Sequence, residues 1–197
     1  MTDTIILFDL ETSGLDSRKH EIIQIASAAY SIAHGEVFDE FATNVAFDVK
    51  RAEPKALEVN CYDPAKWEGA PTAFEALDKW SRWLRPHCGV RKFSERTGRE
   101  YFVALGAGYN AVKFDYPWIV QKSKELGLFI PLDPKILDVM QLALWLNRLN
   151  GADVADDKQV TVCAHYGINY EAHDALGDVR GMAELINRLT GRSTSNE

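Results

Sequence analysis

Two carboxylates close the first apolar segment of this 197-residue chain. The β-favouring run from Thr4 to Phe8 leads into Asp9, Leu10 and Glu11, so we expect a strand that is buried on both faces and ends in acids. Because side chains alternate along a strand, Asp9 and Glu11 project to the same side. Two acids aimed at one point repel each other unless a cation lies between them. The pair predicts half of a divalent-metal site, and the alternative is a capped strand end with solvated acids.

Further acids and a histidine stand at the ends of other expected elements. Asp115 lies where a strand ending in small residues meets a helix that starts near Pro117, a position at which a helix N-cap is the alternative. Asp178 belongs to the last expected helix, and His173 precedes it where loop becomes helix. Five residues correspond to roughly 140° around a helix axis, so these two share a face poorly if both are helical. At the helix entrance, His173 can lean over the same pocket as the acids.

Four carboxylates and one histidine are the parts of a two-metal site for phosphoryl transfer. Hard divalent cations such as Mg²⁺ take oxygen ligands and leave room for water and substrate phosphate. Two such ions, roughly 3.5–4 Å apart, can generate a hydroxide on one side of a phosphorus and stabilise the leaving oxygen on the other. A histidine can remove the proton of the attacking water. The cysteines, Cys61, Cys88 and Cys163, form no CxxC pair, so zinc or redox chemistry is disfavoured.

The order of elements predicts an α/β domain with a mixed sheet. Segments 21–32 and 37–44 flank a turn at His34-Gly35, which indicates a β-meander after the first strand. Strands and helices alternate in the rest of the chain, as in α/β proteins, where chemistry gathers at strand ends. Apolar spacing, caps and breakers predict helices over 54–60, 72–86, 117–126, 139–149, 160–165 and 174–190.

Length and punctuation predict a single domain over residues 1–190, with a flexible tail over 191–197. Residues 87–100 are polar and basic and indicate a hairpin-like insertion, after which strand residues resume at Tyr101 to Leu105. Seven basic residues cluster between positions 79 and 99. They either form solvated faces or contact phosphates: Lys79, Arg82, Arg85, Arg91, Lys92, Arg96 and Arg99.

Composition excludes some classes of protein. The net charge is −7, which argues against a protein that coats nucleic acid by charge alone, although bound cations would reverse the local field of an acidic site. No apolar run approaches a membrane span, and the first residues lack the features of a secretory signal. We therefore expect a soluble cytoplasmic protein without a membrane partner, and no protein partner is evident.

Three motifs of the chain resemble those of a known enzyme class. The segments Phe8 to Leu15, Tyr109 to Asp115, and His173 to Asp178 are similar, in order and over nearly the whole chain, to the exonuclease motifs of the DEDDh class. This class belongs to the DnaQ-like, ribonuclease H-like superfamily of 3′-5′ exonucleases. The resemblance implies a ribonuclease H-like mixed sheet, an antiparallel meander followed by parallel strands, flanked by helices.

The resemblance also implies a role for each motif residue. Asp9 would bridge two divalent ions, Mg²⁺ or Mn²⁺, and Glu11 and Asp178 would complete the shell of the first ion. Asp115 would support the second ion through water, and His173 would be the general base. The enzyme would act from a 3′ end and release nucleoside 5′-monophosphates.

Neighbours of the motifs are candidates for holding substrate. The resemblance puts forward Leu10, Thr12 and Leu15 as contacts of the terminal nucleotide. Phe114 could stack on a base, with core packing as the alternative. Asn110 could position either the substrate or Asp115.

Details of the middle motif resemble one branch of the class. The pattern from Gly108 to Asp115 is more like exonuclease I, which digests single-stranded DNA, than like relatives with His-Asn at the positions of Tyr109 and Asn110. The further domains of exonuclease I and a polymerase-binding tail are not in this sequence, so we expect a free-standing, non-processive enzyme. The expected partner is nucleic acid with a free 3′ end, DNA favoured over RNA. An exoribonuclease or oligonucleotide hydrolase, and a catalytically idle nucleic-acid-binding module, are the alternatives.

Overall fold

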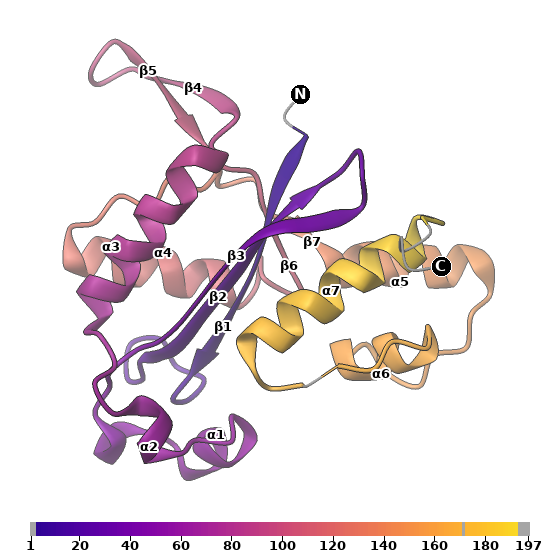
Figure 1. The fold of residues 1–197 in the computed structure, drawn as a ribbon, viewed down its shortest axis with the longest axis horizontal. Helices are drawn as coiled ribbons and strands as arrows, with labels where there is room; N and C mark the ends of the chain where they lie inside the picture. Colours follow the sequence, from indigo (N-terminus) through magenta and orange to yellow (C-terminus); the bar gives the residue numbers. More distant parts are fainter. Residues whose placement is uncertain (1–2, 171, 193–197) are drawn as a thin grey trace.

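A five-stranded sheet of order β3-β2-β1-β6-β7 forms the centre of the fold (Figure 1). The structure is a computed structural model and describes residues 3–170 and 172–192. β1 pairs antiparallel with β2 and parallel with β6, so the expected ribonuclease H-like sheet, a meander followed by parallel strands, is confirmed. The strands are β1 Thr4–Thr12, β2 Ile22–Ser31, β3 Glu36–Asn44, β6 Gly106–Gly108 and β7 Leu137–Asp138.

Helices cover both faces of this sheet, and each of the six expected helices is present with small changes at its ends. An additional short helix, α2, starts at Pro64 and is capped by the side chain of Asp63, where the sequence indicated only a break. The α-helices are α1 Pro54–Val59, α2 Pro64–Trp67, α3 Ala73–Leu84, α4 Asp115–Leu126, α5 Val139–Asn150, α6 Gln159–His165 and α7 Ala175–Leu189. No helix among the described residues is long and apolar enough to cross a membrane.

The two faces of β1 enter two separate hydrophobic clusters. Ile6, Phe8 and Leu10 pack in a cluster with α3 and α4, whereas Leu7 packs in a cluster with residues of α5, α6 and α7. Because side chains alternate along the strand, Asp9 and Glu11 follow Leu7 on the face covered by α7. The apolar pattern of β1 therefore fixes which helix meets the acids.

The hairpin expected at residues 87–100 is present, but it extends to residue 103. β4 Val90–Ser94 and β5 Arg99–Val103 pair only with each other and form a two-stranded sheet of their own. Residues 101–103 therefore stay in the hairpin, Ala104 forms an isolated bridge with Leu132, and the main sheet receives β6. A β-carbon at Gly106 would lie 3.0 Å from the Phe8 side chain, and one at Gly108 would lie 2.8 Å from the Phe8 carbonyl oxygen. Close packing against β1 thus requires the small residues of β6.

The hairpin and the acidic end of β1 lie at opposite ends of the sheet. The chain leaves β5 and passes the start of β1, where the Ile6 N–H donates to the Leu105 carbonyl oxygen at 2.8 Å. In Figure 1 the β4-β5 hairpin projects from this end, and α1 and α2 lie at the other end. Of the expected C-terminal tail, residues 193–197 lie outside the described residues.

Candidate active site

The acidic pair of β1 lies where the strand leaves the regular ladder. Asp9 and Glu11 are both half-buried, and the register between β1 and β2 shifts after Glu11. Each carboxylate offers an oxygen within 4.8 Å of the other and of Asp178. The structure therefore brings together the first and the last motif, which are separated by most of the chain.

Helix α7 delivers Asp178 from its first turn. The Asp174 side chain caps the helix by accepting from the Gly177 N–H at 3.1 Å, and the Asp178 carboxylate accepts from the His173 N–H at 2.9 Å. His173 has a φ of 63° and precedes the helix, as expected from its spacing. Its left-handed backbone turns the chain into α7 and leaves its side chain exposed.

Gln24 on β2 anchors the start of α7, and sequence reasoning assigned it no role. Its amide nitrogen donates to the Asp174 carboxylate at 3.2 Å, and its amide oxygen accepts from the Ala175 N–H at 2.9 Å. Gln24 is also the strand partner of Glu11. Gln24 therefore lies opposite Glu11 on the neighbouring strand and also holds the start of α7, the helix that carries Asp178. Nothing local in the sequence signals this, because the pairing depends on strand register.

Asp115 lies beside β1 at the start of α4. It is the first residue of the helix and 3% exposed, and the cap position is held by Phe114. Its carboxylate accepts from the Leu10 N–H at 3.0 Å. The parallel ladder between β1 and β6 covers only Ile6 and Leu7, so the Leu10 N–H has no strand partner on that side. Asp115 supplies the missing acceptor. It is not the N-cap of α4, which was the alternative considered from the sequence.

A fifth acid, Asp138, has a structural role. Its carboxylate accepts from the N–H groups of Asn110 at 3.2 Å, Val112 at 3.4 Å and Gln141 at 3.3 Å. It thereby caps α5 and holds the turn before Asp115. Asn110 has a φ of 59° in that turn, and its carbonyl oxygen accepts from the Phe114 N–H. Asn110 therefore shapes the approach to α4 through its backbone.

Burial and mutual repulsion shift the titration of the acidic cluster. Removal from water raises the pKa of Asp9 well above its usual value, and the charges of Asp115, Glu11 and Asp178 raise it further. Burial, followed by the charges of Asp178 and Asp115, raises the pKa of Glu11 to about 8. The pKa of Asp115 is raised to about 7, mainly by burial. Burial also raises the pKa of Asp178.

This donor set fits hard divalent cations. Among residues 3–170 and 172–192, no lysine or arginine forms an ion pair with Asp9, Glu11, Asp115 or Asp178. The charge of His173 opposes the rise in the pKa of Asp178. Carboxylate oxygens are the ligands that Mg²⁺ and Mn²⁺ prefer. A cation bound to Asp9, Glu11 and Asp178 would lower their pKa values and remove the repulsion.

Four of the five expected substrate contacts line one groove of about 320 Å³ beside Glu11. Leu10 and Thr12 are buried, Leu15 is 78% exposed at the rim, and Phe114 packs against the core with its ring 6.0 Å from that of Trp118. Asn110 does not line this groove. The sequence predicted α1 but not its role, which is to supply the opposite wall with Ala56, Val59 and Asn60.

A second, polar groove of about 360 Å³ lies on the His173 side of the acids. Gln24, Asn44, Lys66 and His173 line it, and Asn60 lines both grooves. The Asn60 amide donates to the Thr12 carbonyl oxygen at 3.0 Å, which fixes α1 against the end of β1. Glu11 therefore lines the apolar groove, His173 and Asp174 line the polar groove, and the two grooves meet at Asn60.

Known proteins share this sheet and resemble this chain in sequence. A family model described as exonuclease, RNase T, matches residues 6–97, which include Asp9 and Glu11. The PolC-type DNA polymerase III of Clostridium perfringens is 30% identical over 186 residues, which is 93% of this chain and 11% of the polymerase. Protein NEN3 of Arabidopsis thaliana is 30% identical over 97 residues, 48% of this chain and 19% of that protein.

Solved structures of exonuclease I share the fold over nearly the whole chain. One matches with a TM-score of 0.76 at 15% identity and covers 98% of this chain and 42% of the other. Exonuclease I of E. coli in complex with a dT13 oligonucleotide matches with a TM-score of 0.75 at 16% identity, over 97% and 42% of the two chains. Residues 6–97 thus match the RNase T exonuclease family, and the chain spans less than half the length of the relatives and solved structures named here.

Proposed function

We propose that the chain is a metal-dependent 3′-5′ exonuclease that releases nucleoside 5′-monophosphates from single-stranded DNA. The observation that carries this proposal is the convergence of Asp9, Glu11 and Asp178 within 4.8 Å, with Asp115 beside them on Leu10. A groove large enough for a terminal nucleotide opens next to Glu11. The solved complex of E. coli exonuclease I with dT13 supports single-stranded DNA as substrate.

The four acids divide into two sets around the end of β1. Asp9, Glu11 and Asp178 would hold one cation, and Asp115, with Asp9 between the two sets, would hold a second. Two such ions supply a Lewis acid and an acidified water molecule for attack on the phosphodiester. Buried, preorganised carboxylates suit this role because they need little reorganisation during the reaction.

The remaining residues bind the substrate and move a proton. Leu10, Leu15 and Phe114 would contact the terminal base and sugar in the apolar groove. The exposed imidazole of His173 would take the proton of the attacking water as the new P–O bond forms and the bond to the 3′ oxygen breaks. Its place outside α7 leaves it free to reach the scissile phosphate. The released product carries a 5′-phosphate.

A gel time course with 5′-labelled and 3′-labelled single strands tests the proposal. DNA and RNA of the same sequence are compared with Mg²⁺, and Asp9→Asn is the control. We expect a descending ladder from 5′-labelled DNA, immediate release of the 3′ label as mononucleotide, and no reaction by Asp9→Asn. Faster digestion of RNA would replace the DNA assignment. Binding of both polymers without cleavage would contradict the proposed activity and favour a catalytically idle nucleic-acid-binding module.

A further inference from the structure

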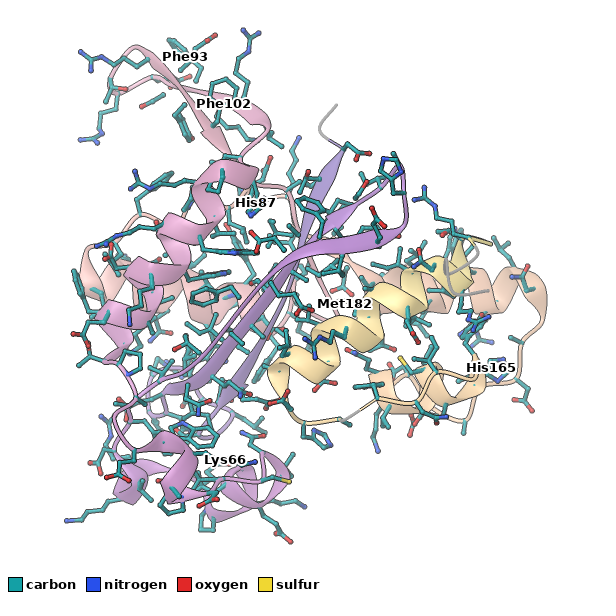
Figure 2. The ribbon with its side chains drawn as sticks, viewed as in Figure 1. Lys66, His87, Phe93, Phe102, His165 and Met182 are labelled. Carbon is teal, nitrogen blue, oxygen red and sulfur yellow. The ribbon has the colours of Figure 1, made fainter. Side chains whose placement is uncertain are left out.

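The β4-β5 hairpin presents one face that no other described element of the fold covers. Cross-strand partners project to the same side of a hairpin, so the pairs Arg91 with Phe102 and Phe93 with Glu100 share a face. Phe93 is 62% and Phe102 is 53% exposed, and Figure 2 shows both on the hairpin that projects from the body. Two aromatic rings therefore stand in solvent on a single surface.

The opposite face holds the hairpin in place. The Lys92 ammonium forms an ion pair with Asp133 at 2.7 Å, and the Asp133 side chain is 4% exposed. The Tyr101 ring contacts that of Phe129, with centroids 6.1 Å apart. The hairpin is thus attached to the loop before β7, and its exposed rings are presented from an ordered element.

The charge of the hairpin is opposite to that of the chain. The protein has a net charge of −7, but the segment 90–103 has more basic than acidic residues. Arg91 pairs with Glu100 at 3.2 Å. In the described part of the chain, neither Arg96 nor Arg99 forms an ion pair, although both are exposed. Arg99 is the strand partner of Ser94 and therefore projects to the face of Lys92 and Tyr101, whereas Arg96 lies in the turn. The Arg96 guanidinium is therefore available for a polyanion bound at the aromatic face.

We propose that this aromatic face, with Arg96 in the adjoining turn, binds a single-stranded segment of nucleic acid 5′ to the end being digested. Exposed aromatic rings stack on unpaired bases without sequence preference, and arginines contact the backbone. A duplex would not serve, because its bases are already stacked on one another. This inference rests on the proposed function, because the bound strand is the substrate of the exonuclease. Binding of the strand to the hairpin does not itself require hydrolysis.

The position of the hairpin makes this contact dependent on substrate length. The face lies at the end of the sheet where β1 begins, and the acids lie at the other end (Figure 1). β1 has nine residues, which span about 30 Å at roughly 3.3 Å per residue, and the hairpin lies at the start of this strand. A strand that occupies the acid site therefore has to be long to reach the hairpin. A long strand therefore gains affinity from the hairpin, and a short one does not.

The test compares oligothymidylates of 5 and 30 nucleotides with wild type and Phe93→Ala/Phe102→Ala. We expect KM for the longer strand to rise at least about 10-fold in the variant and KM for the shorter strand to stay unchanged. Phe93→Leu/Phe102→Leu keeps apolar bulk without aromatic rings, and we expect the same loss. The matched control is Trp145→Ala, because Trp145 is a 68% exposed aromatic residue on α5, and no change is expected there.

Two further measurements separate the inference from the proposed function. Fluorescence anisotropy in EDTA gives Kd for the longer strand without hydrolysis, and the same rise is expected. In Arg96→Ala the salt dependence of this Kd should weaken by about 0.7 for the lost phosphate contact, with Arg148→Ala as control. No hydrolysis of either strand by wild type contradicts the proposed function alone.

An unchanged Kd for the longer strand in the phenylalanine variants would overturn the inference. An equal rise for both lengths would also overturn it, because the effect would then reach the acid site through the fold. A dimer that sediments in wild type but not in the variants, with unchanged Kd, would assign the face to contact between two copies and overturn nucleic-acid binding.

Discussion

The Asp115 carboxylate accepts a hydrogen bond from the Leu10 N–H at 3.0 Å across 105 residues of sequence. This contact joins the first motif to the middle one at the place where β1 has no strand partner on its β6 side. Asp115 therefore satisfies a buried backbone donor and adds negative charge to the site. Its two roles respond differently to substitution.

Replacement of Asp115 separates these two roles. Asp115→Asn keeps an oxygen that can accept from Leu10, whereas Asp115→Ala leaves this buried N–H without an acceptor. We expect the alanine variant to be less stable than the asparagine variant by about 1–3 kcal/mol in urea denaturation with EDTA, and both to lose hydrolysis. Equal stability of the two variants would show that the hydrogen bond contributes nothing.

The metal-free protein should lose stability as pH rises. Raised pKa values of Asp9, Glu11 and Asp115 mean that the folded state binds protons that the unfolded chain has released. This contribution is fully present below the unfolded pKa values, about 4, and is lost as pH rises through the folded values, which are about 7 for Asp115 and about 8 for Glu11.

Thermal melting in EDTA at pH 5 and pH 8 measures this effect. One pKa unit corresponds to about 1.4 kcal/mol, so we expect Tm to fall by at least roughly 3–6 °C between these pH values. Mg²⁺ should raise Tm more at pH 8 than at pH 5, because it binds the charged carboxylates. Asp9→Asn should show a smaller fall. A Tm in EDTA that is independent of pH would contradict the cause given for the raised pKa values.

Substitution of His173 should affect turnover more than metal binding. Because His173 has a positive φ, Asn is the better variant, since it adopts this conformation more readily than Ala. We expect His173→Asn and His173→Ala to lower kcat by about two to four orders of magnitude and to keep the rise of Tm with Mg²⁺. His165→Ala, an exposed histidine on α6, is the control. A wild-type kcat in His173→Asn would remove this residue from the reaction.

Gln24 should control metal affinity without touching the metal. Its amide fixes Asp174 and the Ala175 N–H, so Gln24→Ala should loosen the first turn of α7 and displace Asp178. We expect the Mg²⁺ concentration for half-maximal activity to rise about 10–100-fold, with a smaller change in kcat at saturating Mg²⁺. Gln141→Ala, an exposed glutamine on α5, should behave as wild type. A change in kcat alone would place Gln24 in the reaction.

Local sequence determined the elements and the acids at their ends. The apolar run of β1, the capping box of Thr72 and Glu75, and the apolar spacing of α7 depend on neighbours within a few residues, so each could be predicted. The alternation of β1 also placed Asp9 and Glu11 on one side. The order of the motifs was enough to indicate the family.

Tertiary structure decided which residues meet. The Tyr101 to Leu105 segment has strand propensity, but packing against Phe8 admits only the small residues of β6, so residues 101–103 pair within the hairpin instead. Gln24 and Asn60 gained their roles from strand register and from the docking of α1. The hairpin is distant from the acid site because it is joined to the end of the sheet where β1 begins, and the acids lie at the other end. Long-range contacts of this kind depend on the packing of the whole domain, which local patterns do not encode.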